Sequence, residues 1–127
     1  MAAVTSTRVI ALGEVAPIPL AKGSWSRLLI HQQTVASSRT TLGYSVFKAG
    51  SRTDDLNHTV DELAYVVAGS GTLLLEDSTL AVSEGDALFI PGGVWHTVAA
   101  APAEDLVMVF AFPWPGYPPT ERRPARP

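Results

Sequence analysis

The sequence contains no cysteine, which excludes disulfides, thiolate nucleophiles and thiolate metal ligands. Any metal ion must therefore be held by nitrogen and oxygen atoms. Charged residues make up only 17% of the chain, and the net charge of −3 gives no electrostatic reason to expect nucleic acid or an anionic membrane as a partner. No apolar run approaches the roughly 18 residues of a membrane helix, and no signal-peptide pattern opens the chain. We expect a cytoplasmic protein.

The 127 residues are enough for one domain with a single core, and a second domain is not expected. Apolar residues account for 46% of the chain, which is typical of a globular protein. We expect one domain over residues 1–127, with its core at about residues 24–112 and a proline-rich segment at 113–127.

Short apolar runs separated by turn residues fill most of the chain, and helical periodicity of useful length is missing. This pattern predicts an antiparallel sandwich or barrel. Gly69-Ser70-Gly71 is interpreted as a tight turn that joins its flanking strands in a hairpin. The expected strands cover residues 8–12, 24–33, 41–49, 62–68, 72–76, 79–82, 87–90, 96–100 and 105–112.

The segment after residue 112 is dense in proline, which donates no hydrogen bond to a sheet, so it cannot lie inside one. Two interpretations remain open. The segment is a flexible tail, or Trp114 and Tyr117 cover the mouth of a barrel or a partner subunit, since aromatic side chains gain from burial.

Two of the three histidines, His58 and His96, lie in segments that resemble the two motifs of the cupin superfamily. The first motif is matched by Gly50, His58, Glu62 and Gly69, and the second by Gly85, Pro91, Gly93 and His96. The resemblance implies an all-β fold, the double-stranded β-helix or jelly-roll barrel. It also implies a metal site formed by His58, Glu62 and His96.

The sequence departs from the motifs at two positions. Leu56 stands where the family has its first histidine, and Ala100 stands where an asparagine commonly ends the second motif. The implied site is therefore one ligand short, unless Asn57, Asp54 or Asp55 substitutes. The consequence is either an open coordination position or a lost metal.

Strand geometry constrains how His58 and Glu62 can share an ion. Side chains four residues apart on a straight strand lie about 13 Å apart, whereas metal ligands lie about 2.1 Å from the ion. The chain must therefore turn at residues 59–61, with His58 ending one strand and Glu62 opening the next. Leu56 and His58 then point the same way.

Strand alternation predicts which side chains surround the metal. Ala64 and Val66 share the face of Glu62, while Val94 and Val98 share the face of His96. The predicted substrate pocket is lined by Leu56, Ala64, Val66, Val94 and Val98, and it suits an apolar or aromatic molecule.

The opposite faces of the same strands carry Leu63, Tyr65, Val67 and Trp95. Exposed to water, they would form an unusually apolar surface, so we expect a second layer or a second subunit to cover them. A homodimer is the simplest prediction.

Two imidazoles and one carboxylate are the ligand set of non-haem Fe(II) oxygenases, and they also suit catalytic zinc. Fe(II) is the favoured metal, with Zn, Mn or Ni as alternatives, and an oxygenase acting on a compact organic molecule is the leading hypothesis. A second hypothesis is a cyclase, dehydratase, lyase or isomerase in which Tyr44, Tyr65 or His31 acts as acid or base. A third is a binding protein that has lost its metal.

Overall fold

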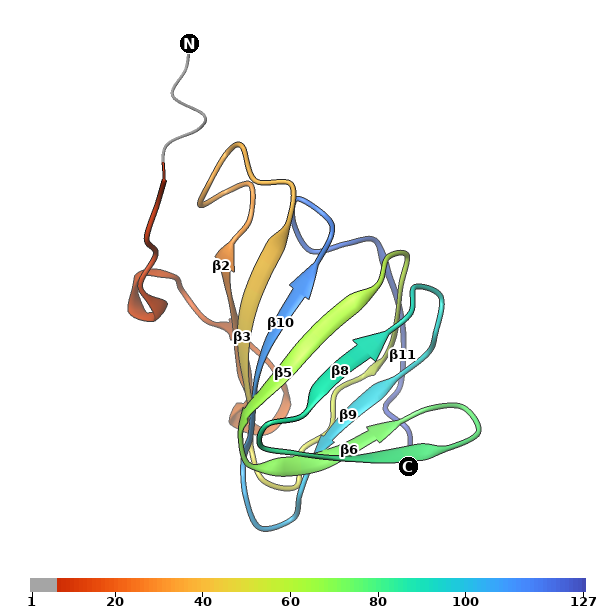
Figure 1. The fold of residues 1–127 in the computed structure, drawn as a ribbon. Helices are drawn as coiled ribbons and strands as arrows, with labels where there is room; N and C mark the ends of the chain where they lie inside the picture. The colour runs from red at the N-terminus through yellow and green to blue at the C-terminus, as the bar shows by residue number, and fades with distance from the viewer. Residues whose placement is uncertain (1–6) are drawn as a thin grey trace.

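A computed structural model describes residues 7–127, and it is built almost entirely of antiparallel strands (Figure 1). No α-helix occurs among the described residues, so the all-β fold predicted from the sequence is confirmed. The strands are β1 Ile18–Pro19, β2 Trp25–Ile30, β3 Thr41–Phe47, β4 Asp55–His58, β5 Glu62–Ala68, β6 Ser70–Leu74, β7 Thr79–Ser83, β8 Ala87–Ile90, β9 Thr97–Ala100, β10 Leu106–Phe112 and β11 Thr120–Arg123. Two 3₁₀ turns, η1 Leu12–Glu14 and η2 Ala21–Gly23, precede β2.

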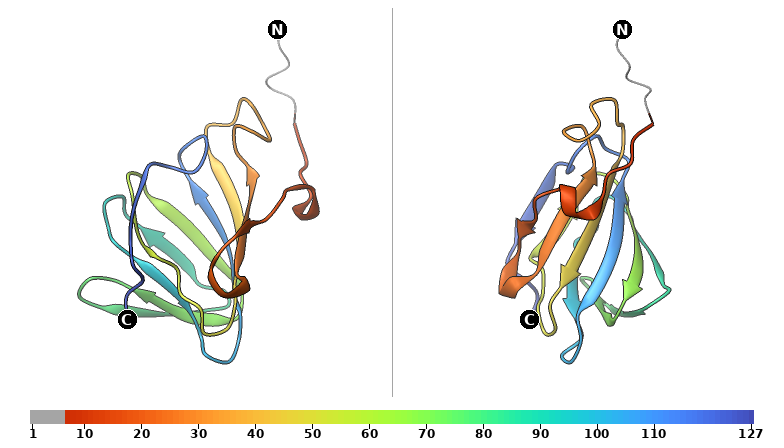
Figure 2. Two further views of the ribbon diagram at one scale, coloured as in Figure 1. Left: turned by 180° about the vertical axis from the view of Figure 1, so that it is seen from behind. Right: turned by 90° about the vertical axis from the view of Figure 1, so that its left-hand side faces the viewer.

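The strands form one large sheet and two small ones. The large sheet has the order β1-β2-β3-β10-β5-β8, and the small sheets have the orders β7-β6-β9 and β11-β4. In Figure 1 the large sheet runs from β2 across to β8, and β6, β9 and β11 follow beyond it. Figure 2 shows from behind and from the side how the small sheets face the large one.

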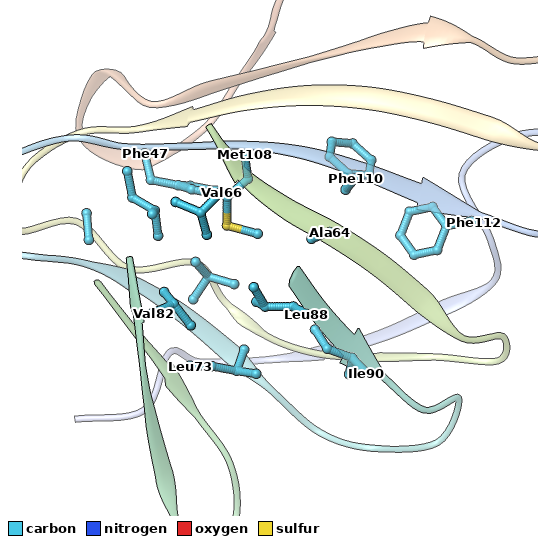
Figure 3. Close-up of a cluster of buried hydrophobic side chains, with 13 residues drawn as sticks. Phe47, Ala64, Val66, Leu73, Val82, Leu88, Ile90, Met108, Phe110 and Phe112 are labelled. Atoms are coloured by element: carbon cyan, nitrogen blue, oxygen red, sulfur yellow. The ribbon is translucent and has the colours of Figure 1, made fainter. Parts of the chain in front are cut away.

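The core lies between these sheets because strands of the large sheet alternate apolar side chains toward it. On β10 the buried residues alternate with half-buried ones, and Leu106 and Phe112 are almost completely enclosed. Leu73 of β6 and Val82 of β7 belong to the same cluster and come from the three-stranded sheet β7-β6-β9 (Figure 3). Each large side chain of this kind contributes about 1.5–3 kcal/mol when it is fully removed from water.

A glycine on the inner face of β3 makes room for an aromatic ring. A side chain at Gly43 would collide with the ring of Phe110, the residue opposite it on β10. The glycine therefore leaves the space that the Phe110 ring occupies, and Phe110 lines the cavity inside the barrel.

Two expected elements differ from the structure. Residues 8–12 form no strand, because this run finds no partner strand and leads into η1. The hairpin expected around Gly69 is wrong: β5 pairs with β10 and β8, whereas β6 pairs with β7 and β9. Gly69 has φ +82° and leaves room for the carbonyl of Asp105, so the chain crosses there from one sheet to the other.

The proline-rich residues 113–127, called the C-terminal strap below, pack on the barrel. The Thr41 hydroxyl donates to the carbonyls of Trp114 and Gly116, 2.9 Å from each. Beyond them β11 pairs with β4 in antiparallel register. The strap therefore packs on the barrel and adds a strand that the sequence analysis did not predict. Of the two aromatic residues expected to cover a barrel mouth, Tyr117 lines the cavity of the barrel, whereas Trp114 does not and is 39% exposed.

Within residues 7–127, no helix has the length and apolar character needed to cross a membrane.

Candidate metal site

The predicted corner between His58 and Glu62 is present, since β4 ends at His58 and β5 begins at Glu62. The loop before β9 docks on this corner. Gly92 lies so close to the Thr59 carbonyl that a side chain there would meet it, and the Gly92 N–H donates to the Asp61 carboxylate at 3.0 Å. Gly93, at φ +87°, donates to the His58 carbonyl at 2.8 Å. This docking brings the chain of the second motif, and with it His96, beside the first.

His58, Glu62 and His96 converge as the motifs imply. Glu62 Oε1 lies 3.2 Å from His58 Nε2 and 3.4 Å from His96 Nε2, and the three candidate ligand atoms all lie within 4.8 Å of one another. Two ligands each about 2.1 Å from one ion are separated by about 3.0–3.4 Å in octahedral or tetrahedral geometry. The spacing therefore fits a single metal ion.

Both imidazole rings are fixed by a contact at the other nitrogen. Thr120 Oγ1 lies 2.7 Å from His58 Nδ1, and the Val94 carbonyl lies 2.9 Å from His96 Nδ1. Histidine ligands of metals typically donate their second N–H in this way, which leaves the first nitrogen free to bind the ion. The donor set and the ring orientations together fit a divalent cation.

His58, Glu62 and His96, called the trio below, lie close enough for Glu62 and His96 to shift each other's pKa. Burial disfavours the charged form of Glu62, but hydrogen bonds from His58 and His96 outweigh it and lower the pKa of the carboxyl. Burial also opposes protonation of His96, yet the hydrogen bond and charge of Glu62 prevail and raise its pKa. A proton on His96 Nε2 and a metal ion compete for the same lone pair.

Leu56 occupies the position of the missing ligand. Its backbone exchanges two hydrogen bonds with His96, of 2.8 and 2.9 Å, and its side chain lines the same cavity as the trio. In the described part of the chain neither Asp54 nor Asp55 joins the cluster, and Asn57 is not among the residues that line the cavity. Asp55 is enclosed among Thr97 and two arginines, and Asp54 is exposed beside Arg122, whereas Asn57 is half-buried and carries no carboxylate.

A cavity of about 680 Å³ opens beside the trio, large enough for a drug-sized molecule. Its walls are mainly apolar, with charged groups of Arg52, Asp54 and Arg122 in addition to Glu62. The apolar lining comes from Ile18, Pro19, Leu20, Ala21, Leu28, Phe47, Leu56, Val98, Met108, Phe110 and Phe112.

Of the predicted pocket residues, only Leu56 and Val98 are among those that line this cavity. Ala64 and Val66 share the face of Glu62, as expected, but they are covered by neighbouring side chains and belong to the core. Val94 is half-buried and packs against that core as well. Strand alternation predicted the direction of Ala64 and Val66 correctly, but both are buried in the core cluster and do not line the cavity.

The predicted acid or base residues lie away from the cavity. Tyr44 and Tyr65 are on the outer face of the large sheet, where Tyr44 stacks on Trp25 and Tyr65 is 51% exposed. His31 follows β2 in a turn held by Thr34. None of the three lines the cavity, because each follows the outward side of its strand or lies past its end.

Tyr117 is the functional candidate that the sequence analysis placed only as a cover. Its ring packs edge-on against His58 and Phe112, with centroids 5.6 and 5.5 Å apart, and the residue lines the cavity. Burial, reinforced by the charge of Glu62, raises the pKa of Tyr117 to about 12. Because 40% of the residue is exposed, solvent screens part of this shift, but the phenol is protonated at neutral pH in either case.

The outward apolar side chains expected from the sequence are partly covered and partly exposed. Trp95 is covered from within the chain, by the Arg123 guanidinium 3.9 Å above its ring. Leu63, Tyr65 and Val67 on β5 remain exposed, together with Phe89 on β8.

The chain belongs to the cupin family, because residues 43–112, more than half of its length, match the family described as the cupin domain. Solved structures agree. The polyketide cyclase RemF from Streptomyces resistomycificus is 24% identical, with a TM-score of 0.78 over 92% of this chain and 85% of that one. A cupin-like protein from Thermotoga maritima is 22% identical, with a TM-score of 0.75 over 91% and 84% of the two chains.

A deletion mutant of Bacillus subtilis oxalate decarboxylase is 20% identical, with a TM-score of 0.79, and matches 92% of this chain but 32% of its own. By sequence, an uncharacterized protein of Methanocaldococcus jannaschii is 27% identical over 86 residues, which are 67% of this chain and 69% of that protein. At the identities of the solved structures the likeness shows the fold alone, and it confirms the predicted barrel.

Proposed function

We propose that this protein is a mononuclear metalloenzyme that acts on a compact, largely apolar organic molecule bound in its barrel. The observation that carries the proposal is the convergence of three ligand atoms, from the buried His58 and His96 and the half-buried Glu62, on the wall of a large cavity. A leucine in place of a fourth ligand favours an open, catalytic site over a closed, structural one.

The ion would serve as a binding point for substrate and dioxygen if it is Fe(II), the favoured metal, or as a Lewis acid if it is Zn, with Mn and Ni as further alternatives. The chain supplies the rest of the site. Phe110 and Phe112 offer an aromatic wall for the body of the substrate, and Leu56 keeps the adjoining coordination position free of protein ligands.

An oxygenase is the first candidate, because two histidines and one carboxylate with open positions are the ligand set of non-haem Fe(II) oxygenases. A non-redox reaction, such as cyclisation or dehydration, is the second. It is favoured by the protonated phenol of Tyr117 beside His58, which can donate a proton or a hydrogen bond to a substrate oxygen. The likeness in fold to a polyketide cyclase also supports this second candidate.

The first test is metal content. Protein purified without added metal, then titrated with Fe(II) under nitrogen and with Zn(II), should bind one ion per chain. His58→Ala and Glu62→Gln should each weaken binding by at least about 100-fold, because a ligand is removed outright. His31→Ala is the matched control and should bind normally. A wild-type protein that binds neither ion would leave the third hypothesis, a small-ligand-binding protein without metal.

Oxygen dependence separates the two enzymatic candidates. Turnover that consumes dioxygen and stops under nitrogen supports the oxygenase, whereas turnover that continues under nitrogen supports the non-redox reaction. In the second case Tyr117→Phe should lower kcat by about 10²–10⁴-fold with metal content unchanged, as expected for loss of an acid catalyst. Tyr44→Phe, on the outer face, is the control that should leave kcat unchanged.

We also propose the homodimer, with the outer face of the large sheet as its interface. On β3, β5, β8 and β10 every outward side chain is uncharged, so two such faces can meet without burying an unpaired charge. Phe89, 61% exposed, is the most open of the large side chains on this face. Phe89→Glu should convert a dimer into a monomer by light scattering, whereas Leu80→Glu, equally apolar but on β7, should not. A monomeric wild-type protein contradicts the dimer.

The cytoplasm is the proposed location, and fractionation of cells that express the protein tests it.

A further inference from the structure

The C-terminal strap lies outside the segment that matches the cupin domain, residues 43–112, yet it reaches the candidate metal site. Residues more than sixty positions apart in the chain are brought together there, since β11 pairs with β4 and places Thr120 opposite His58. The strap is therefore positioned by backbone pairing to act on a specific ligand.

The hydrogen bonding of Thr120 defines what its hydroxyl can do. The hydroxyl donates to the Pro118 carbonyl at 2.8 Å, so its oxygen is left to accept a proton from a neighbour. His58 Nδ1 is that neighbour, at 2.7 Å. With Nδ1 occupied by Thr120, Nε2 of His58, 3.2 Å from Glu62 Oε1, is the nitrogen left to bind an ion.

A buried carboxylate holds the strap in this register. Asp55, with no exposed surface, accepts hydrogen bonds from Arg123 Nε at 2.6 Å, Arg126 Nε at 3.0 Å and the Thr97 hydroxyl at 3.0 Å. Asp55 belongs to β4, the same strand as His58, and Arg123 belongs to β11, the same strand as Thr120. Asp55 and the two arginines, called the Asp55 clamp below, thus hold together the two strands that carry His58 and Thr120.

We propose that Thr120 is a positioning residue for the metal ligand His58, which makes the C-terminal strap a working part of the metal site. The inference rests on the proposed function, because it assumes that His58 binds a metal. It adds that metal affinity depends on a hydroxyl supplied from outside the cupin motifs. A purely structural Thr120 would instead affect folding stability and leave the affinity of the folded protein unchanged.

The experiment measures Zn(II) affinity by competition with a chromophoric chelator for the wild type, Thr120→Val and Thr120→Ser. Valine keeps the shape but removes the acceptor, so affinity should fall by about 10–100-fold, the usual effect of losing such a contact to a ligand. Serine keeps the oxygen and should restore affinity to within about threefold of the wild type. Thr79→Val, an exposed threonine of β7, is the matched control and should bind as the wild type does.

A second readout follows His58 directly and needs no activity. In the Zn(II) protein, nitrogen NMR of labelled histidine should show Nδ1 protonated and Nε2 metal-bound in the wild type and in Thr120→Ser. In Thr120→Val the His58 signals should shift or broaden, because the ring has lost the acceptor that fixes its orientation. The signals of His96, held by the Val94 carbonyl, should remain in place.

The outcomes separate the two proposals. If the wild type binds Zn(II) and Thr120→Val binds it equally well with unchanged His58 signals, the positioning role is overturned and the metal site stands. If Thr120→Ser is as weak as Thr120→Val, the hydroxyl is not the relevant feature, which also overturns the inference. If the wild type binds neither Zn(II) nor Fe(II), both proposals fail together.

Discussion

The two ends of the described chain border the same cavity but are attached to the barrel in different ways. The N-terminal arm, residues 7–24, is joined to the large sheet by the two-residue strand β1. The Arg27 guanidinium also holds it, donating to the carbonyls of Leu12 and Val15 at 2.9 and 3.1 Å. At the end of the arm the Ser24 hydroxyl accepts a hydrogen bond from the Lys48 N–H at 2.9 Å. Most of its side chains are exposed, and it contributes apolar groups such as Ile18 and Leu20 to the cavity.

The C-terminal strap is attached through buried charge. It pairs along the whole of β4 and ends on the Asp55 clamp, where Arg126 also lies against Asp55 with only 20% of its side chain exposed. What it contributes to the site is polar: the hydroxyls of Tyr117 and Thr120. The barrel supplies the candidate ligands, one end lines the cavity with apolar groups, and the other end brings a hydroxyl to His58.

Removing the clamp should have the largest effect. Asp55→Asn leaves two arginines beside a neutral amide and should lower the free energy of unfolding by about 2–4 kcal/mol, less than for a fully buried pair because Arg123 is 40% exposed. Urea unfolding measures it. Glu76→Gln, at the exposed end of the same cluster, is the control and should change stability by less than about 0.5 kcal/mol. Equal effects of both changes would refute the difference between buried and exposed attachment.

Low pH should weaken the attachment of the strap to the barrel, because it protonates the Asp55 carboxylate. Burial opposes ionisation of Asp55, but hydrogen bonds from Arg123, Arg126 and Thr97 outweigh it and lower its pKa below the usual 3.8. A lowered pKa in the folded state means that the carboxylate stabilises the fold above pH 3.8, and that this stability is lost as the pH falls through the folded pKa. The stability gap between wild type and Asp55→Asn should thus be full at pH 6 and shrink progressively below about pH 4. A gap independent of pH would contradict this.

Substitutions in the N-terminal arm should have the smallest effect on folding stability. They should instead weaken the binding of a molecule in the cavity. Ile18→Ser, at a cavity-lining and 45% exposed position, should change stability by less than about 0.5 kcal/mol. It should weaken binding of an apolar ligand several-fold, because apolar contact area in the cavity is lost. Metal affinity should stay at the wild-type value. A loss of metal with Ile18→Ser would show that the two ends do not have separate roles.

Much of the site could be predicted from residue spacing and strand geometry. The distance between ligands on a straight strand required a corner at residues 59–61, and the structure has it. The same alternation placed Ala64 and Val66 on the inner face, although neighbouring side chains cover them. It also placed Tyr65 on the face opposite to that of Glu62, and the structure has it there, away from the cavity, although Tyr65 was a candidate acid or base.

The remainder depends on contacts between distant segments, which leave no local pattern. The turn signal at Gly69 is the same for a hairpin and for a crossing between sheets, and only the approach of the Asp105 carbonyl distinguishes them. Likewise nothing near Thr120 indicates that it pairs with His58, because the pairing depends on Asp55 of β4, which binds Arg123 of β11 and Arg126 beyond it. Proline density in residues 113–119 pointed away from a strand, and β11 begins directly after it.

The pairing of β11 with β4 also has a consequence for the order of events during synthesis. A ribosome releases β4 to β10, which carry the three candidate ligands, before it releases the strap. The contact of His58 Nδ1 with Thr120 therefore forms only after all three candidate ligands have been synthesised. If Thr120 positions His58 as proposed, a chain that ends before the strap should bind metal more weakly than the full chain.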